Sequence, residues 1–391
     1  MNTHQREILK HFVNLVNSYT FLKEFSFSKN CVIPDVGTEI EFSDYVLFFD
    51  GYLILFQLKE RSIRSNSDQV ELNWIKNKIL KKAKTQLKDS VKFLTEAKTV
   101  FVKNESGDTF NINYSKINNV YKLIIYFYPD KIPKSFVPIK YYTSADIGFI
   151  HIFDFVSYKN ICDILFTPIE ITKYLDFREQ HLSLIFSAKN ESEKYLVGRY
   201  LLSPKAIDID LDSRGDDFSK YVDKLDLKIS EYDMRYVFQA IRSKMFYTLG
   251  DELDYYRFMT ELALLDRLEL AEFKERFSLA LKKVEEDNFN INRMISSNTR
   301  CGFVFICLQN GDRQDRIKLS KAITRLAKYD MKLEKTLGIT FIEESKDIVT
   351  IYWTYVSYPW EFNEGTEKTI KETDLFSPLK YRIGKLYKFK P

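Results

Sequence analysis

An acid, an amide and an ammonium stand at positions that a β-hairpin would bring together. Two apolar runs, TEIEFSDYVLFFD and GYLILFQLKE, meet at Asp50-Gly51, and this dipeptide between such runs is a strong short-range hairpin signal. With these two residues in the turn, positions 49 and 52 face each other. The residue numbers of every cross-strand pair then add up to 101, so Asp44 faces Gln57. Lys59 lies two positions further on and points to the same face. The pattern predicts one shared pocket for the three side chains.

The two predicted strands are apolar on both faces, which is typical of central strands covered on each side. An unpaired carboxylate or ammonium there would cost several kcal/mol, because buried charges are tolerated only when they are paired or bound to metal. A hard divalent cation together with a substrate phosphate would compensate the charges of Asp44 and Lys59.

An acid on one strand, a tight hairpin and then (Asp/Glu/Gln)-x-Lys on the next strand resembles the PD-(D/E)XK nuclease superfamily, in its Gln-x-Lys variant. The resemblance is carried by Glu41, Asp44 and the strand GYLILFQLKER, and it covers roughly residues 38–95, with weaker agreement to about 185. It implies a restriction-endonuclease-like fold, in which a mixed sheet is flanked by helices. Gln57 stands where the commonest pattern has Asp or Glu, so one negative metal ligand is missing.

The resemblance also implies a role for each residue of this group. Asp44 would ligate Mg²⁺, for which Mn²⁺ can substitute, and Gln57 and the backbone carbonyl of Leu58 would complete the protein ligands. The metal would polarise the scissile phosphate and lower the pKa of the attacking water. Lys59 would orient or deprotonate that water and stabilise charge in the transition state. Glu41 would support a second metal or a metal-bound water, although strict alternation puts it on the other face.

A basic amphipathic helix is predicted directly after the hairpin, over residues 73–95. Its lysines, opposed only by Asp89, would contact phosphates if they lie beside the site, or would simply form a solvated face. Gln86 flanks the apolar stripe of this helix, as does Lys82 one turn earlier. In relatives of the superfamily a helix Gln after the catalytic Lys helps to form the site, so the resemblance extends to Gln86. The lysines are Lys76, Lys78, Lys81, Lys82, Lys84, Lys88 and Lys92.

The order of the predicted elements indicates an α/β fold with two domains. A helix at 5–20, the hairpin, the helix at 73–95 and strands at 121–128 and 149–153 form a mixed α/β layout, closed by helices at 155–165 and 168–185. Residues 1–187 are therefore assigned to the nuclease-like domain. Residues 188–391 are assigned to a C-terminal α/β domain with a role in recognition, sensing or oligomerisation. Its predicted helices cover 231–249, 252–287 and 313–330, and its predicted strands cover 302–308, 338–342 and 347–356.

The composition excludes several classes of protein. The 391 residues carry a net charge of only +4, so any nucleic-acid surface must be local. The four cysteines have neither zinc-knuckle spacing nor a disulfide framework, and the four scattered histidines argue against histidine-led catalysis. The charged N-terminus is unlike a secretory signal, and no stretch approaches the ~20 apolar residues of a spanning helix. A cytoplasmic protein without a membrane partner is expected.

Three weaker signals are read as structural. The acidic run IDIDLDSRGDD (Asp208, Asp210 and Asp212) lacks the glycine and glutamate positions of a calcium loop. Gln309–Asp312 follows a strand without a phosphate-loop pattern and is favoured as a plain turn. The aromatic residues Trp353, Tyr355, Tyr358 and Trp360 could stack on bases, but core packing is favoured.

Two functional hypotheses remain open. The first is a Mg²⁺-dependent endonuclease that hydrolyses DNA in preference to RNA; the resemblance suggests antiviral defence or mobile-element biology in bacteria, with regulation by a partner protein or by homo-oligomerisation. The second, favoured by Gln57, is a catalytically weak or inactive protein of the nuclease fold that binds nucleic acid or acts as a scaffold.

Overall fold

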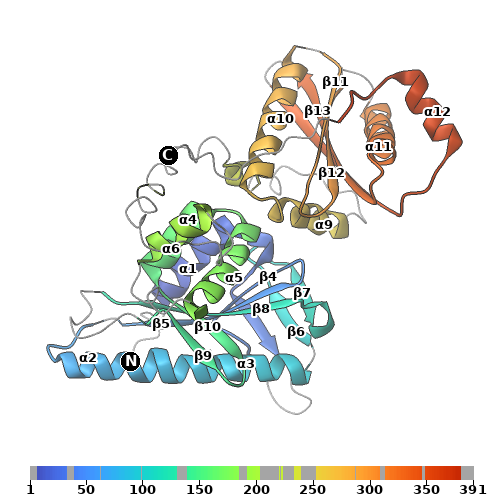
Figure 1. Ribbon diagram of the computed structural model, residues 1–391. Coiled ribbons are helices and arrows are strands. Elements are labelled where there is room, and N and C mark those ends of the chain that lie inside the picture. The colour runs from blue at the N-terminus through green and yellow to red at the C-terminus, as the bar shows by residue number, and fades with distance from the viewer. Residues whose placement is uncertain are drawn as a thin grey trace. The chain divides into compact units, whose positions relative to one another are not determined.

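A computed structural model describes the chain as two compact units, one within Met1–Lys228 and the other within Ile229–Lys388. Each is described by itself. The residues described are 7–32, 39–61, 63–97, 99–129, 139–184, 192–202, 220, 222, 233–238, 252–286, 288–308, 313–345 and 348–379. Over these residues the expected mixed α/β class is confirmed, because three sheets are flanked by helices (Figure 1).

The first unit is built on a six-stranded sheet in the order β1-β4-β5-β8-β10-β9. The hairpin strands β4 and β5 are central, as the apolarity of both faces predicts, and β5 pairs in parallel with β8. The β8 strand in turn pairs in parallel with β10, while the outer pairs are antiparallel. The strands are β1 (Ser26–Phe27), β4 (Tyr45–Phe49), β5 (Tyr52–Glu60), β8 (Asn119–Phe127), β9 (Tyr141–Ser144) and β10 (Gly148–Asp154).

Helices cover both faces of this sheet (Figure 1). One face carries α1 (Glu7–Thr20), α4 (Phe155–Leu165), α5 (Pro168–Leu184) and α6 (Glu193–Leu202). The other face is crossed by one long helix, formed by α2 (Asp68–Trp74), the π-helical segment η3 (Ile75–Ala83) and α3 (Lys84–Ala97). The prediction of a helix over 73–95 is confirmed, and the helix starts five residues earlier. Thr167 caps α5 through its hydroxyl, which accepts a hydrogen bond from the Glu170 N–H.

A second, antiparallel sheet in the first unit was not predicted. Its strands lie in the order β3-β2-β6-β7, with bounds β2 (Lys29–Val32), β3 (Ile40–Glu41), β6 (Thr99–Lys103) and β7 (Thr109–Asn113). Short 3₁₀ turns η2 (Lys23–Phe25) and η4 (Tyr114–Lys116) flank it. One side of this sheet packs into the same core as the long helix. That core includes Val46, Leu53 and Leu55 of the hairpin, Ile79 and Leu87 of the helix, and Val100 and Ile112 of the small sheet.

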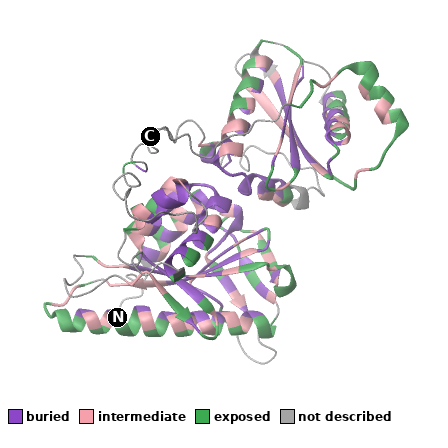
Figure 2. Ribbon diagram, viewed as in Figure 1, coloured by how far each residue is buried: buried purple, intermediate pink, exposed green. Residues whose placement is uncertain are grey.

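The second unit is a four-stranded sheet in the order β11-β12-β13-β14 between helices α10 and α11. Its central strand β12 is buried along its whole length, whereas β11 and β14 are mostly half-buried (Figure 2). The elements are α9 (Glu252–Ala263), α10 (Arg267–Glu285), β11 (Asn290–Ile295), β12 (Cys301–Leu308), α11 (Arg313–Asp330), β13 (Lys335–Ser345), β14 (Ile348–Ser357) and α12 (Glu364–Thr373).

Two sequence-based boundaries differ from those of the structure. The single segment expected at 252–287 is two helices, because Asp266 caps α10 in a capping box with Glu269 and thereby starts a new helix. The first unit extends beyond the expected limit of residue 187, since α6 packs against α4 and α5. Asp208, Asp210, Asp212, Gln309 to Asp312 and most of 231–249 lie outside the described residues. Among the described helices none is both long and apolar enough to cross a membrane.

Candidate active site

The hairpin has the predicted register. Tyr45 pairs with Phe56 and Phe49 pairs with Tyr52, so each pair sums to 101. Asp50 and Gly51 have φ angles of 44° and 80°, as a type I′ turn requires. A Cβ at Gly51 would come within 2.5 Å of the side-chain nitrogen of Asn118, so both its φ and its surroundings call for glycine.

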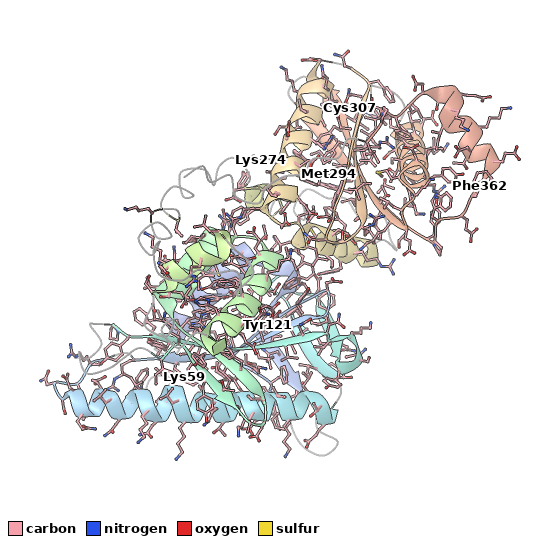
Figure 3. The ribbon with its side chains drawn as sticks, in the orientation of Figure 1. Lys59, Tyr121, Lys274, Met294, Cys307 and Phe362 are labelled. Atoms are coloured by element: carbon pink, nitrogen blue, oxygen red, sulfur yellow. The ribbon has the colours of Figure 1, made fainter. Side chains whose placement is uncertain are left out.

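The structure brings Asp44, Gln57 and Lys59 together around one ammonium group. The Lys59 Nζ lies 3.2 Å from Asp44 Oδ2, 3.2 Å from Gln57 Oε1 and 2.9 Å from the backbone oxygen of Leu58. Asp44 Oδ2 also accepts a 2.7 Å hydrogen bond from the Leu58 N–H. The three side chains predicted to lie together therefore converge, and the Leu58 carbonyl joins them; Lys59 donates and the three oxygens accept. Lys59 is labelled in Figure 3.

Burial makes this arrangement electrostatically important. The side chain of Lys59 is 11% exposed and that of Asp44 is 25% exposed, and Gln57 is buried. One negative and one positive charge lie in contact at the end of an apolar face, so the pair is neutral overall. Removing either charge alone would leave the other poorly solvated, which typically costs more than the intact pair contributes.

Backbone and side-chain hydrogen bonds fix the segment that leads into Asp44. The Ser43 N–H donates to Asn30 Oδ1 at 2.8 Å, and the Ser43 hydroxyl donates to the Phe56 backbone oxygen at 2.7 Å. Ser43 is buried, so these bonds are shielded from water. Asp44 thus joins the cluster from a short segment that is bound to both β2 and β5, although it lies one residue before β4 begins.

Beyond Lys59, the chain is attached to the long helix through a buried carboxylate. Glu71 accepts hydrogen bonds from the Arg61 guanidinium at 2.7 and 3.0 Å, from the Ser65 N–H at 2.6 Å and from the Tyr128 hydroxyl at 2.5 Å. The hydrogen bonds from Arg61, helped by those from Tyr128 and Ser65, lower the pKa of Glu71 to about 2. The sequence analysis did not identify Glu71. It is one of several polar residues at the start of the long helix, and no sequence pattern distinguishes a buried acid there from an exposed one.

The neighbouring strand adds a further group that the sequence did not reveal. In the parallel register of β5 and β8, Tyr126 pairs with Lys59 and Ile124 pairs with Gln57. Burial, assisted by the charge of Asp154, raises the pKa of the Tyr126 hydroxyl well above its usual value, so this group stays protonated. The strand itself was predicted from YKLIIYFY, but its register against β5 depends on a long crossover that the sequence does not specify.

The supporting residues expected from the sequence lie in different surroundings. Glu41 belongs to the small sheet and forms an exposed ion pair with Lys10 at 3.1 Å. Lys82 is exposed on the outer side of the long helix. Gln86 is half-buried, and its side-chain oxygen is buried without a hydrogen-bond partner among the described residues. The structure therefore groups neither Glu41 nor Lys82 with the Lys59 ammonium, and it leaves the Gln86 oxygen available as an acceptor.

The lysines of the long helix divide into two sets. Toward its C-terminal end, Lys88 pairs with Asp146, Lys92 lies 3.8 Å from Glu96, and Lys84 lies over the ring of Tyr142. Toward the end that adjoins Glu71, four lysines are exposed and form no ion pair within the described part of the chain: Lys76, Lys78, Lys81 and Lys82. An unneutralised positive surface therefore lies on the first half of the helix, as a phosphate-binding role would require.

The oxygen atoms around the Lys59 ammonium suit a hard cation. Asp44 Oδ2, Gln57 Oε1 and the Leu58 carbonyl already surround a positive nitrogen, and carboxylate, amide and backbone oxygens are the ligands that Mg²⁺ accepts. Only one of the three is charged, and the described residues hold no cluster of three or more His, Cys, Asp or Glu side chains suited to a metal. A divalent ion at this position would need further ligands from water and from an anionic substrate.

The aromatic residues near the end of the second unit are engaged in packing. Trp353 packs against Phe258 with ring centroids 4.4 Å apart and the rings tilted by 39°, and the Trp360 indole N–H donates to the Tyr329 backbone oxygen. Tyr358 lies under the Lys328 ammonium at 3.6 Å. The expected core packing is therefore wrong for Tyr358, which is 49% exposed, whereas Trp353, Tyr355 and Trp360 are half-buried.

Comparison of the chain with models of protein families, with curated proteins and with solved structures finds no match.

Proposed function

We propose that this protein is a Mg²⁺-dependent nuclease with a restriction-endonuclease-like first unit, whose active site is formed by Asp44, Gln57 and Lys59. The observation that carries the proposal is the convergence of three oxygens on the Lys59 ammonium at the end of an otherwise apolar sheet face. A cluster of this kind contributes little to folding, because a buried ion pair rarely stabilises a protein more than apolar side chains would. A role in catalysis explains the presence of this cluster better than a role in folding does.

In the proposed site, each side chain has a distinct task. Mg²⁺ bound between Asp44, Gln57 and the Leu58 carbonyl would polarise the phosphodiester and acidify a water molecule. Lys59 moves from these oxygens to the substrate phosphate, where its positive charge stabilises the developing negative charge. The Leu58 N–H continues to hold Asp44 Oδ2, so the carboxylate stays oriented when Lys59 leaves. Tyr126 remains a neutral hydrogen-bond donor beside Lys59.

DNA is the proposed substrate, and an endonucleolytic mode is favoured. The exposed Lys76, Lys78, Lys81 and Lys82 provide the phosphate contacts on the helix that covers the same sheet face. Gln57 in place of an acid leaves a weakly charged metal site, so cleavage should require more Mg²⁺ than a site with two carboxylates would. The competing proposal is a protein that binds nucleic acid without cleaving it, and the lone charged ligand is the observation that favours it.

Plasmid nicking tests the proposal. Wild-type protein and the variants Asp44→Ala, Lys59→Ala and Lys116→Ala are incubated with supercoiled DNA in Mg²⁺, Mn²⁺ or EDTA. Removal of one charged group that acts in the transition state is expected to slow cleavage by about 100- to 1000-fold. Lys116 is an exposed lysine of η4, so its variant should nick like the wild type. Equal nicking by all four proteins, or metal-dependent binding without any nicking, would contradict the nuclease assignment.

A further inference from the structure

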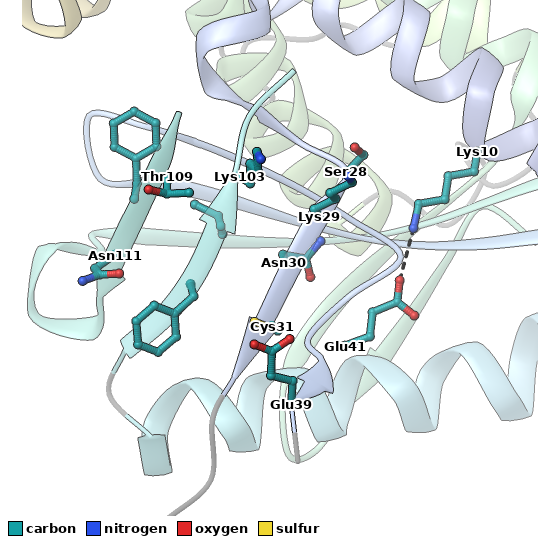
Figure 4. Close-up of a pocket in the computed structure, with 13 residues that line it drawn as sticks. Lys10, Ser28, Lys29, Asn30, Cys31, Glu39, Glu41, Lys103, Thr109 and Asn111 are labelled. Carbon is teal, nitrogen blue, oxygen red and sulfur yellow. Dashed lines mark hydrogen bonds and ion pairs between the residues drawn. The ribbon is translucent and has the colours of Figure 1, made fainter. Parts of the chain in front are cut away.

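The small sheet of the first unit has an exposed side that lines a pocket of about 600 Å³ (Figure 4). Strand residues alternate between the two sides: Val100, Val102 and Ile112 face the core, whereas Lys29, Phe101 and Lys103 face solvent. The pocket therefore lies on the side of the sheet that points away from the long helix. It is lined by side chains from β2, β3, β6 and β7 and by Lys10 of α1.

Two lysines face each other directly across this surface. The register pairs Lys29 of β2 with Lys103 of β6, and both are exposed. Neither forms an ion pair with any residue that the structure describes. Directly opposed like charges on neighbouring strands have Cβ atoms about 4.5–5.5 Å apart and destabilise a sheet. An anion bound between the two ammonium groups would reverse this repulsion.

An aromatic ring lies in the next row of the same surface. Phe101 pairs with Cys31 on one side and with Asn111 on the other, and it is 38% exposed. Over the described residues it makes no ring-to-ring contact. A planar apolar ring next to paired cations, with an amide beside it, matches a nucleotide: the base stacks on the ring while its phosphate lies between the ammonium groups.

The pocket is also connected to the segment that carries Asp44. Asn30 lies between Lys29 and Cys31 on β2, and its side chain receives the Ser43 N–H. Glu41, at the rim of the pocket, is three residues before Asp44 and is held by Lys10. A ligand bound in the pocket would therefore contact β2, the same β-strand that supports the proposed catalytic acid.

We infer that this pocket binds single-stranded nucleic acid, with a phosphate between Lys29 and Lys103 and a base stacked on Phe101. The inference rests on the proposed function for its class of ligand. Its occupant is a single strand rather than a duplex, because bases that are paired and stacked in a duplex do not expose a face to an aromatic ring. The pocket would hold a displaced or unpaired strand near the site of cleavage.

Fluorescence anisotropy in EDTA tests the inference without any cleavage. Labelled oligo(dT) and a duplex of equal length are titrated with wild type, Phe101→Ala, the double variant Lys29→Gln/Lys103→Gln and the control double variant Tyr114→Ala/Lys116→Gln. The control removes an exposed aromatic residue and an exposed lysine from η4 of the same unit. Phe101→Ala should weaken oligo(dT) binding by roughly 5- to 100-fold. The double lysine variant should reduce the slope of log K against log salt concentration by about 0.7, the value expected for the loss of one phosphate contact on a single strand.

Both effects should be confined to the single strand, and the control should bind like the wild type. Affinities of the two test variants equal to that of the wild type would overturn the inference, even if the protein cleaves DNA. The reverse outcome is also possible to recognise. If the wild type binds oligo(dT) but never nicks plasmid, and both test variants lose oligo(dT) binding, then the proposed nuclease activity is wrong and the binding site is supported. Thermal melting of each variant verifies that it folds.

A native thiol gives an independent footprint of the pocket. Cys31 is partly exposed within the pocket, whereas Cys162, Cys301 and Cys307 are buried. Burial, with a smaller contribution from the charge of Glu39, raises the pKa of the Cys31 thiol, so alkylation is followed at alkaline pH. Saturating oligo(dT) should slow alkylation of Cys31 several-fold, and Cys31→Ser should show no fast phase. Protection by polyglutamate but not by oligo(dT) would assign the pocket to an acidic peptide and refute the inference.

Discussion

The central strands β5 and β12 occupy equivalent positions in two sheets of similar construction. Each has an antiparallel neighbour on one side and, after a helical crossover, a parallel neighbour on the other. All eight residues of β12 are buried. By contrast, β5 is apolar through Phe56 and then carries Gln57 and Lys59, which form a hydrogen-bonded cluster with Asp44. The comparison teaches that a sheet of this kind can form with a central strand that carries no ion pair, as β12 does. The polar end of β5 is therefore not required by the fold.

In the second unit, charged groups lie on the strands beside β12 and not on β12 itself: Lys335 of β13 pairs with Glu261, and Arg293 of β11 pairs with Asp330. On the adjacent strand β13, the Thr340 hydroxyl lies 2.6 Å from the Ser320 hydroxyl of α11, and both are buried. Two hydroxyls satisfy each other without a net charge, and so their burial costs far less than that of a carboxylate and an ammonium. Within these two sheets, the difference is that the first unit places one member of an ion pair, Lys59, on its central strand.

The largest effect is expected from truncating equivalent core residues in the two central strands. Leu55→Ala and Ile306→Ala each remove a fully buried aliphatic side chain and should lower the free energy of unfolding of their own unit by about 2–5 kcal/mol. Hydrogen exchange resolved by peptide measures each unit separately. Leu55→Ala should reduce protection in β4, β5 and β8 and also reduce DNA cleavage, whereas Ile306→Ala should affect β12 and β13 and preserve cleavage. If either variant reduced protection equally in both sheets, the two units would not be independent and the comparison of their central strands would be wrong.

A smaller loss is expected from Glu71→Gln, which keeps the shape of the side chain but removes its charge. The variant should lose about 1–3 kcal/mol at neutral pH, because hydrogen bonds to a charged acceptor are stronger. The pKa of Glu71 is about 2 in the folded protein against 4.5 as the ordinary value, so its stabilisation is present above about pH 4.5 and disappears as the pH falls toward 2. Urea unfolding at several pH values measures this. The wild-type advantage over Glu71→Gln should shrink on acidification, and an advantage that grew instead would refute the assignment.

An effect of intermediate size is expected from Gln57→Glu, which adds a second carboxylate beside Asp44 and should change the metal concentration that cleavage requires. The metal concentration for half-maximal cleavage should fall on the order of tenfold, because affinity for hard cations rises with the number of charged ligands. Without metal, the added charge beside Asp44 should destabilise the first unit. Plasmid nicking over a Mg²⁺ series, with thermal melting in EDTA and in Mg²⁺, measures both. A metal requirement identical to that of the wild type would mean that residue 57 does not contact the ion.

The smallest effect is expected from Asp146→Asn, which releases Lys88 from an exposed ion pair on the long helix. Exposed pairs contribute little, so the free energy of unfolding should change by less than about 0.5 kcal/mol. The freed ammonium should slightly tighten duplex binding and make it more dependent on salt. Binding titrations at two salt concentrations detect this change. Weaker binding would show that this end of the helix does not face DNA.

Local sequence patterns predicted the part of the site that depends on local geometry. The Asp50-Gly51 turn and strict alternation were sufficient to place Asp44, Gln57 and Lys59 on one face, because both strands and the turn are contiguous in the chain. Glu41 could not be placed in the same way. The chain leaves β3 after Glu41 and enters a different sheet at Tyr45, so alternation cannot be counted across residues 42–44.

The remaining parts of the fold required information that local sequence does not carry. Strands β2, β6 and β7 are only four or five residues long, and their polar residues, such as Asn111 and Lys103, have low strand propensity. They form a sheet because Val100, Val102 and Ile112 reach the core from one side. Likewise, Glu71 acquires its role from Arg61 and Tyr128, and the latter is 57 positions away in sequence.

The tight turn at Asp50-Gly51 restricts how this protein can evolve. The Gly51 carbonyl accepts hydrogen bonds from the N–H groups of Asn118 and Asn119, so the loop before β8 fixes the tip of the hairpin in place. Inserting or deleting one residue between the tip and Gln57 would turn the amide and the ammonium to the opposite side of the sheet. Homologous chains should therefore exchange the apolar residues of this hairpin only for others of similar volume, and should preserve the number of residues between acid and lysine.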